Sequence, residues 1–445
     1  MIAPLGEPGW ATHTPFPNFG KAEYFHARGL TPSRVFCPSG NESPVARPAV
    51  HLRLVCIIPV AIPADFALHA GNSPADDGRA QKSHTFSKGR NMARNILILG
   101  ASYGSLLGTK LLMAGHNVSL VCRAKTAELI NRDGTEVRIK LRDEAVHRAI
   151  FSRDLPGKLD AVTPGNVDLS RYDMVGLAMQ EPQYTNHTVR VLMVKIAAAK
   201  LPCLSIMNMP PLPYLKRIPS LADMDLEEAY TNAQVWERFE PGLVTLCSPD
   251  PQAFRPPEEA ANVLHVGLPT NFKASAFADE KHNKVLRELE ADIDAVTLDG
   301  HDVPVKLKVF ASLFVPLAKW SMLLTGNYRC ITPHEPQSIR DAVHGDLARS
   351  QTIYDHVDAI ARRLGADPQD QVPFAKYAKA AESLLKPSSA ARAVASGAPF
   401  IERVDLLVKL ISHQLGTPNA EIDRTVETVD LKLNEKIVQG GSGAQ

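Results

Sequence analysis

The sequence predicts an α/β domain followed by an all-helical domain. Residues 95–99 form an apolar run of strand length, and the next dozen residues repeat leucines at roughly helical spacing until Gly115 ends the helix. Strand and helix patterns then alternate to about residue 300, which is typical of a parallel sheet with covering helices. From about residue 303 the apolar spacing becomes helical. Besides residues 95–99, we expect strands at 118–122, 174–179 and 202–207, and helices at 189–199, along one face from 339 to 364, and at 373–385, 401–415 and 419–437.

The first strand, turn and helix carry the signature of a dinucleotide-binding unit of the Rossmann type. Glycines in such a turn let backbone N–H groups approach a pyrophosphate at the helix N-terminus, where the helix dipole favours negative charge. An ideal motif has glycines at positions 100, 102 and 105, whereas this chain has Ser102 and Ser105 and places its second glycine at 104. We expect the whole turn to contact the cofactor: Gly100, Ala101, Ser102, Tyr103, Gly104 and Ser105.

The residue after the second strand indicates which nicotinamide cofactor the unit binds. NAD-binding proteins usually have an acidic residue there for the ribose 2′-OH, but this chain has Arg123, followed by Lys125. Both side chains are suited to a 2′-phosphate, so the sequence favours NADP(H). The alternative is that Arg123 is a solvated charge at the end of a strand.

Composition excludes several classes of protein. The chain has 445 residues, is 44% apolar and 22% charged, and carries a formal net charge of +1, so it shows no electrostatic footprint for nucleic acid or an anionic membrane. No apolar run reaches the ~18 residues of a membrane span. The cysteines lack metal-ligand spacing, which predicts no metal site and a reducing, cytoplasmic location. They stand at positions 37, 56, 122, 203, 247 and 330.

Residues 1–91 differ from the rest in being rich in Pro, Gly, Ser and His and in lacking sustained periodicity. We expect them to form a disordered extension, consistent with a translation start assigned too early; the alternative is an organelle-targeting arm. The predicted organisation then continues with a Rossmann NADP-binding domain at 92–302, a helical substrate and dimerisation domain at 303–438, and a flexible tail at 439–445.

Residues 98–134, ILGASYGSLLGTKLLMAGHNVSLVCRAKTAELINRDG, followed by a helical C-terminal half, resemble the ketopantoate reductase family of NADPH-dependent 2-oxo acid reductases. The resemblance covers most of 92–440. It implies that Asn208, which follows strand 202–207, lies near the nicotinamide, although the family's next glycine is here Met209. It also assigns cofactor contact to Gln180, where the family usually has a lysine.

The family's general acid is a lysine on the first long helix of the C-terminal domain, followed by substrate-lining asparagines at +4 and +8. Two lysines are candidates. Lys308 is followed by Ser312 at +4, and Lys319 is followed by Asn327 at +8. Eleven residues apart on one continuous helix, the two would share a face.

A further family element is a serine, a glycine eight residues on, and then a glutamate, with the serine and the glutamate facing the substrate. Ser389, Gly397 and Glu402 follow that pattern with the glutamate one residue late. Ser389 could instead cap a helix, and Glu402 could be a solvated residue of a first helical turn.

Carbonyl reduction by hydride needs a proton donor or a fixed cation beside the developing oxyanion. Lys319 stands between Ala318 and Trp320 in a segment with almost no other charge, which favours it on residue chemistry, while counting along the family pattern favours Lys308. For either, the alternative is a snorkelling surface lysine.

We therefore expect an NADPH-dependent reductase of a small 2-oxo acid or related carbonyl compound, with a homodimer as the assembly that the resemblance implies. Two alternatives remain open. One is a non-catalytic NADP-binding sensor that lost the asparagines, and the other is an opine or glycerol-phosphate dehydrogenase on the same architecture.

Overall fold

The structure is a computed structural model that describes residues 92–142 and 144–441. The extension predicted at 1–91 and the end of the predicted tail at 442–445 lie outside the described residues. Within them, no helix combines the length and apolarity needed to cross a membrane.

The main sheet has eight strands in the order β14-β11-β8-β7-β6-β1-β2-β5. The six strands from β8 to β5 are mutually parallel, while β11 runs antiparallel to β8 and parallel to β14. The strands are β1 (Asn95–Leu99), β2 (Asn117–Val121), β5 (Leu159–Val162), β6 (Met174–Leu177), β7 (Cys203–Ile206), β8 (Val244–Ser248), β11 (Phe272–Ser275) and β14 (Leu307–Phe310).

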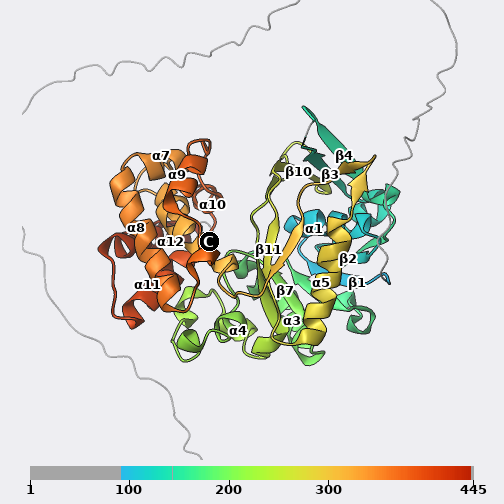
Figure 1. Cartoon of the computed structure of the whole chain (residues 1–445), viewed down its shortest axis with the longest axis horizontal. Helices are drawn as coiled ribbons and strands as arrows, with labels where there is room; N and C mark the ends of the chain where they lie inside the picture. Colours follow the sequence, from blue (N-terminus) through green and yellow to red (C-terminus); the bar gives the residue numbers. More distant parts are fainter. Residues whose placement is uncertain (1–91, 143, 442–445) are drawn as a thin grey trace, which may run out of the picture. The chain divides into compact units, whose positions relative to one another are not determined.

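Both faces of this sheet are buried, which explains why β1 is a continuous apolar run instead of an alternating one. Ile96 and Ile98 pack with helices α1 (Tyr103–Met113) and α5 (Glu280–Asp294). Leu97 and Leu99 point to the opposite face and belong to the buried cluster that contains Leu192, Met193 and Ile196 of helix α3 (His187–Ala198). Figure 1 shows α1 and α5 side by side in front of the sheet.

A smaller sheet extends the sheet region. Its order is β4-β3-β10-β9, and it is joined to the core by helix α2 and flanked by a two-stranded hairpin. The elements are α2 (Ala124–Asp133), β3 (Glu136–Lys140), β4 (His147–Phe151), β9 (Gln252–Phe254), β10 (Val263–Leu268), β12 (Thr297–Leu298) and β13 (His301–Asp302). In the segment between β7 and β8, all of which the structure describes, the only α-helix is the short α4 (Leu212–Leu215).

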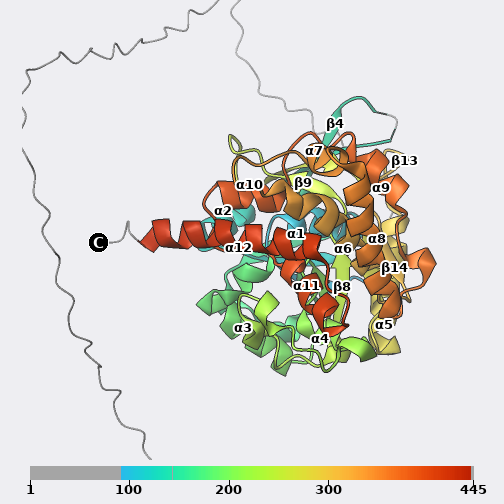
Figure 2. The ribbon, with the colours of Figure 1, turned by 90° about the vertical axis from the view of Figure 1, so that its left-hand side faces the viewer.

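Helices dominate after β14, as expected, and Figures 1 and 2 show α7 to α12 grouped together. One hydrophobic core joins this group to the sheet, since Leu97 of β1 and Ile411 of α11 belong to the same buried cluster. The helices are α6 (Lys319–Met322), which leads into a π-helical turn (Leu323–Asn327), α7 (Ile339–His344), α8 (Leu347–Arg363), α9 (Phe374–Ala381), α10 (Ser389–Ala395), α11 (Val404–Gln414) and α12 (Ala420–Gly441).

Three details differ from the sequence predictions. The helical pattern expected from about 303 begins only after strand β14, which alternates buried and half-buried residues. The face from 339 to 364 belongs to two helices, because Asp346 caps the N-terminus of α8 and interrupts the run after Gly345. Helix α10 was not predicted.

Candidate active site

The glycine turn after β1 shows why the imperfect motif is compatible with a close turn. Gly100 has φ +101°, and a Cβ there would lie 2.6 Å from the Ala178 carbonyl oxygen. A Cβ on Gly104 would lie 2.7 Å from Ile98 Cγ2, so Gly104 provides the close contact between helix α1 and strand β1. Ser105 is buried, and its hydroxyl donates to the Ala101 carbonyl. The glycine needed for helix packing has therefore moved from 105 to 104.

Ser102 and Tyr103 stand at the N-terminus of α1, directly after Gly100 and Ala101. Ser102 is exposed at the N-cap and makes no side-chain cap bond. Tyr103 follows it, half-buried, and burial raises the pKa of its phenol to about 12, with the charges of Glu402 and Asp250 acting in the same direction. Tyr103 thus lies within electrostatic range of two acidic groups from distant parts of the chain.

Basic side chains surround this turn. Arg123, directly before α2, and Lys125 are exposed, and neither side chain has a hydrogen-bond or ion-pair partner among the residues that the structure describes. Arg255 follows β9 and donates from Nη2 to the Ala101 carbonyl, while its Nε is buried without a partner within the described part of the chain. Burial lowers the Arg255 pKa. Sequence reasoning missed Arg255, because only the small sheet brings it to the turn.

Glu402 and Asn208 meet although 194 residues separate them. The Asn208 Nδ2 donates to Glu402 Oε2 at 3.2 Å, and the Glu181 backbone N–H donates to Glu402 Oε1 at 3.4 Å. Burial raises the pKa of Glu402 to about 7 against the opposing effect of these hydrogen bonds. Asn208 Oδ1 is buried and has no partner among the described residues, so an acceptor remains available beside a carboxyl group that is half-protonated near neutral pH.

The Glu402 carboxyl gives a pH-dependent stability. Between its ordinary pKa of about 4.3 and its folded value of about 7, the folded chain keeps a proton that the unfolded chain releases. The free energy of unfolding should therefore fall as pH rises across this window, by up to about 4 kcal/mol from this group. Glu402→Gln should remove that part of the pH dependence in urea unfolding at pH 5 and pH 8. The exposed Glu382→Gln serves as control, and an unaltered pH dependence in Glu402→Gln would contradict the assignment.

Lys319 lies at the carboxyl end of β8. Its Nζ donates to the Pro249 carbonyl at 3.1 Å and lies 3.5 Å from Asp250 Oδ1. Asp250 Oδ2 in turn lies 3.1 Å from Lys273 Nζ of β11. Burial lowers the Lys319 pKa, while the charges of Asp250 and Glu402 oppose that effect and that of Lys273 adds to it. An ammonium has three N–H groups, so one remains for a substrate oxygen after these two contacts.

Lys308 does not belong to this group. It lies on strand β14, is 36% exposed and forms an ion pair with Asp294 at 2.7 Å. The expectation that Lys308 and Lys319 share one helix face is therefore wrong. Residues 307–310 form an edge strand in which buried and half-buried positions alternate. Four residues are too few to distinguish this period of two from the helical period of 3.6.

The other predicted site residues, apart from those of the glycine turn, differ in their exposure and in their contacts. Ser312 donates to Asp370 Oδ2 at 2.6 Å and accepts from the Phe314 N–H, so its hydroxyl is engaged in holding the loop before α6. Asn327 ends the π-helical turn and is half-buried. Ser389 is exposed in the first turn of α10, whose N-cap is its neighbour Ser388. Gln180 is exposed and caps the turn after β6.

Asp250 is the second group that the sequence did not reveal. It lies in the segment between β8 and β9, beyond the βαβ unit, and nothing in its local sequence marks it as facing Lys319, which comes much later in the chain. A weak signal did exist: Asp250 comes two residues after the end of a buried strand in an α/β pattern, where site residues concentrate.

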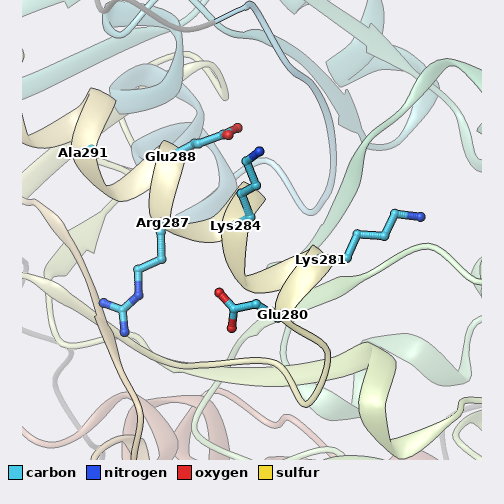
Figure 3. Close-up of a pocket in the computed structure, with 6 residues that line it drawn as sticks. All are labelled: Glu280, Lys281, Lys284, Arg287, Glu288 and Ala291. Atoms are coloured by element: carbon cyan, nitrogen blue, oxygen red, sulfur yellow. The ribbon is translucent and has the colours of Figure 1, made fainter.

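A hollow of about 560 Å³ on the outer face of α5 is not part of this group (Figure 3). One helix supplies all of its lining residues, and they are spaced so as to share one helical face. Two of its charged groups are already paired, Glu288 with Arg94 and Arg287 with Glu290. Because no second element of the described chain lines it, we assign it no function.

The site residues fit a dinucleotide by three structural features. Gly100 holds a positive φ where the backbone must turn tightly, Arg123 is an exposed cation after β2, and Asn208 presents an acceptor without a partner in the described chain after β7. These residues follow strands of the parallel part of the sheet, so they line one carboxyl edge.

Known proteins share this fold at low sequence identity. No family model and no curated protein sequence matches the chain. Among solved structures, a ketopantoate reductase from Ralstonia eutropha has 17% identity and a TM-score of 0.52, covering 77% of this chain and 99% of its own. A 2-dehydropantoate 2-reductase from Methylococcus capsulatus has 13% identity and a TM-score of 0.56, covering 77% and 97%. D-mandelate dehydrogenase in complex with NADH and anilino(oxo)acetate has 14% identity and a TM-score of 0.53, covering 77% and 99%. The predicted fold is thereby confirmed: a Rossmann-like sheet region followed by a helical region, as in ketopantoate reductases.

Proposed function

We propose that this chain is an NADP(H)-dependent reductase of a small 2-oxo acid and a divergent member of the ketopantoate reductase family. The observation that carries the proposal is the convergence of Lys319, Glu402 and Asn208 at the carboxyl ends of β7 and β8, next to the glycine turn. The fold shared with ketopantoate reductases and D-mandelate dehydrogenase supports it.

In this proposal each side chain has a separate task. A reduced nicotinamide, when bound, supplies the hydride. Lys319 donates its remaining N–H to the carbonyl oxygen, stabilises the charge that develops there and then delivers the proton. Glu402, whose pKa lies near neutral pH, can donate a hydrogen bond to the substrate when its carboxyl group is protonated. The hydrogen bond from Asn208 orients that carboxyl group. The glycine turn and Arg123 hold the phosphates of the cofactor.

The direct test of this proposal is a panel of 2-oxo acids with NADPH, followed by the absorbance of the reduced nicotinamide. Turnover of at least one acid supports the reductase.

The second candidate is a non-catalytic NADP-binding sensor. It is favoured by Leu323, which stands four residues after Lys319 where the family has an asparagine, and by Asp250, which already partners the lysine. Tight NADPH binding without turnover on any carbonyl compound would favour the sensor over the reductase.

Cofactor preference provides a further prediction. Because Arg123 and Lys125 are exposed and unpaired within the described residues, NADPH should bind at least about tenfold more tightly than NADH, which corresponds to about 1.4 kcal/mol. Arg123→Ala should remove most of this difference in calorimetric titrations. The exposed Arg132, which is paired with Asp133 at 2.7 Å, provides the control Arg132→Ala. Equal affinities of the unmodified protein for the two cofactors would exclude the NADP assignment.

A further inference from the structure

A cavity of about 550 Å³ lies beside the candidate active site, and we call it the distal pocket. Its walls carry four basic and two acidic side chains. It is lined by Arg142, Asp250, Pro269, Thr270, Asn271, Lys273, Asp302, Pro304, Lys306 and Lys376.

The sheet order places this pocket beyond the reacting centre. Lys273 is the second residue of β11 and Lys306 directly precedes β14, and both strands run antiparallel to β8. Their first residues therefore share an edge with the carboxyl ends of β1, β6, β7 and β8.

Along that edge the order is the glycine turn, Asn208, Asp250 and then the distal pocket. From β7 to β14 is three strand spacings, about 14 Å. A ligand that reacts near Asn208 and extends away from the glycine turn would reach the pocket.

The charges in the pocket do not cancel. Lys273 is paired with Asp250, and Lys306 is paired with Asp302 at 2.6 Å and also donates to the Asp294 carbonyl. Arg142, two residues after β3, and Lys376 of α9 are exposed, and their side chains have no partner among the residues that the structure describes. Two unpaired cations from different elements line one cavity, an arrangement that favours an anion.

Asp250 connects the distal pocket to Lys319. One of its carboxylate oxygens lies 3.5 Å from Lys319 Nζ, and the other lies 3.1 Å from Lys273 Nζ in the pocket wall. A single carboxylate thus separates the candidate proton donor from the pocket. It also occupies the side of Lys319 that faces the pocket, which leaves Arg142 and Lys376 as the cations available to a second acidic group.

We propose that the distal pocket binds a second anionic group of the substrate, a carboxylate or a phosphate, so that the substrate is a dianionic 2-oxo acid. This inference rests on the proposed reductase function. It assigns substrate selection to Arg142 and Lys376, with the 2-oxo end placed at Lys319 and the distal anion between the two unpaired cations.

The test compares acids of equal length. The full-length protein with NADP⁺ bound is titrated calorimetrically with 2-oxoglutarate and with 2-oxopentanoate, which differ in the terminal carboxylate, and turnover of both is measured with NADPH. A third acid, 2-oxo-4-phosphonobutanoate, replaces the carboxylate by a phosphonate and distinguishes the two anions. We expect the dianions to bind at least about tenfold more tightly than 2-oxopentanoate, and the margin to shrink with added salt.

Matched variants locate the effect. Lys376→Ala and Arg142→Ala should each weaken dianion binding by about five- to tenfold and change 2-oxopentanoate binding by less than about twofold. Lys379→Ala is the control, because Lys379 lies on the same helix, does not line the pocket and is paired with Glu382 at 2.7 Å.

The outcomes separate the two proposals. Selective dianion binding without turnover would support the pocket and contradict the reductase. Turnover with equal affinity for the matched acids, or dianion binding unaffected by Lys376→Ala and Arg142→Ala, would overturn the pocket alone. Binding of none of the three acids would overturn it as well.

Discussion

Replacing Lys319 with methionine should lower kcat by roughly 10²- to 10⁴-fold and leave NADPH affinity nearly unchanged. The reason is geometric: Lys319 lies at the carboxyl edge of the sheet, held by the Pro249 carbonyl and Asp250 and within electrostatic range of Glu402. Methionine keeps the volume of the side chain, so packing around the neighbouring Trp320 is retained. Steady-state kinetics on the best acid of the panel, with NADPH calorimetry alongside, measure both quantities.

Lys308→Met is the matched control for that experiment. Lys308, on the edge strand β14, pairs with Asp294 at the end of α5. An exposed ion pair of this kind contributes little to stability. We expect less than about a twofold change in kcat. Full activity of Lys319→Met would eliminate the proposed proton donor, and a large loss in Lys308→Met would show that the wrong lysine was chosen.

The second large effect is expected at Gly100. Gly100→Ala would place a Cβ 2.6 Å from the Ala178 carbonyl oxygen and 2.7 Å from Met179 Cγ, on a residue with φ +101°. The positive φ alone costs about 1–2 kcal/mol for an L-residue, and the clash with backbone adds to it. The turn must therefore shift, and NADPH affinity should fall by about a hundredfold or more, as measured by calorimetry.

Gly115→Ala is the control that distinguishes the cost of a positive φ from the effect of a clash at the cofactor turn. Gly115 also has a positive φ, +91°, but a Cβ added there would meet no described atom within 4 Å, and the residue stands at the opposite end of α1. This variant should lose a similar amount of conformational energy, about 1–2 kcal/mol, and keep its NADPH affinity. If both variants bind NADPH as well as the unmodified protein, the glycine turn is not the cofactor site.

Much of the fold was predictable because its signals are local. The buried run at 95–99, the leucine spacing of α1 and the strands at 174–177 and 203–206 follow directly from periodicity. Strand β14 was not predictable in the same way, since four residues beside a helical pattern carry too few positions to reveal a period of two. Only its pairing with β11 makes it a strand.

The residues of the candidate site also differ in whether a local sequence signal marks them. Lys319 was a candidate because it is a charged residue in an apolar segment, and Asn208 because the family resemblance places a cofactor contact after strand β7. Their roles remain predictions. Asp250 and Arg255 were missed, because their partners Lys319 and Ala101 lie far away in the chain and no local pattern joins them. Ser312 was selected as a substrate contact by counting from Lys308, but its hydroxyl donates a hydrogen bond to Asp370.

The environment of Glu402 links any separation of the sheet region from the helical region to proton release. Its carboxyl is buried against Asn208 and Glu181, which belong to the sheet region, while Glu402 itself lies just before α11. If the two regions part, water reaches the carboxyl and its pKa returns from about 7 toward its ordinary value of about 4.3. At neutral pH each opening then releases a fraction of a proton. Alkaline conditions would therefore favour such an opening, and acidic conditions would oppose it.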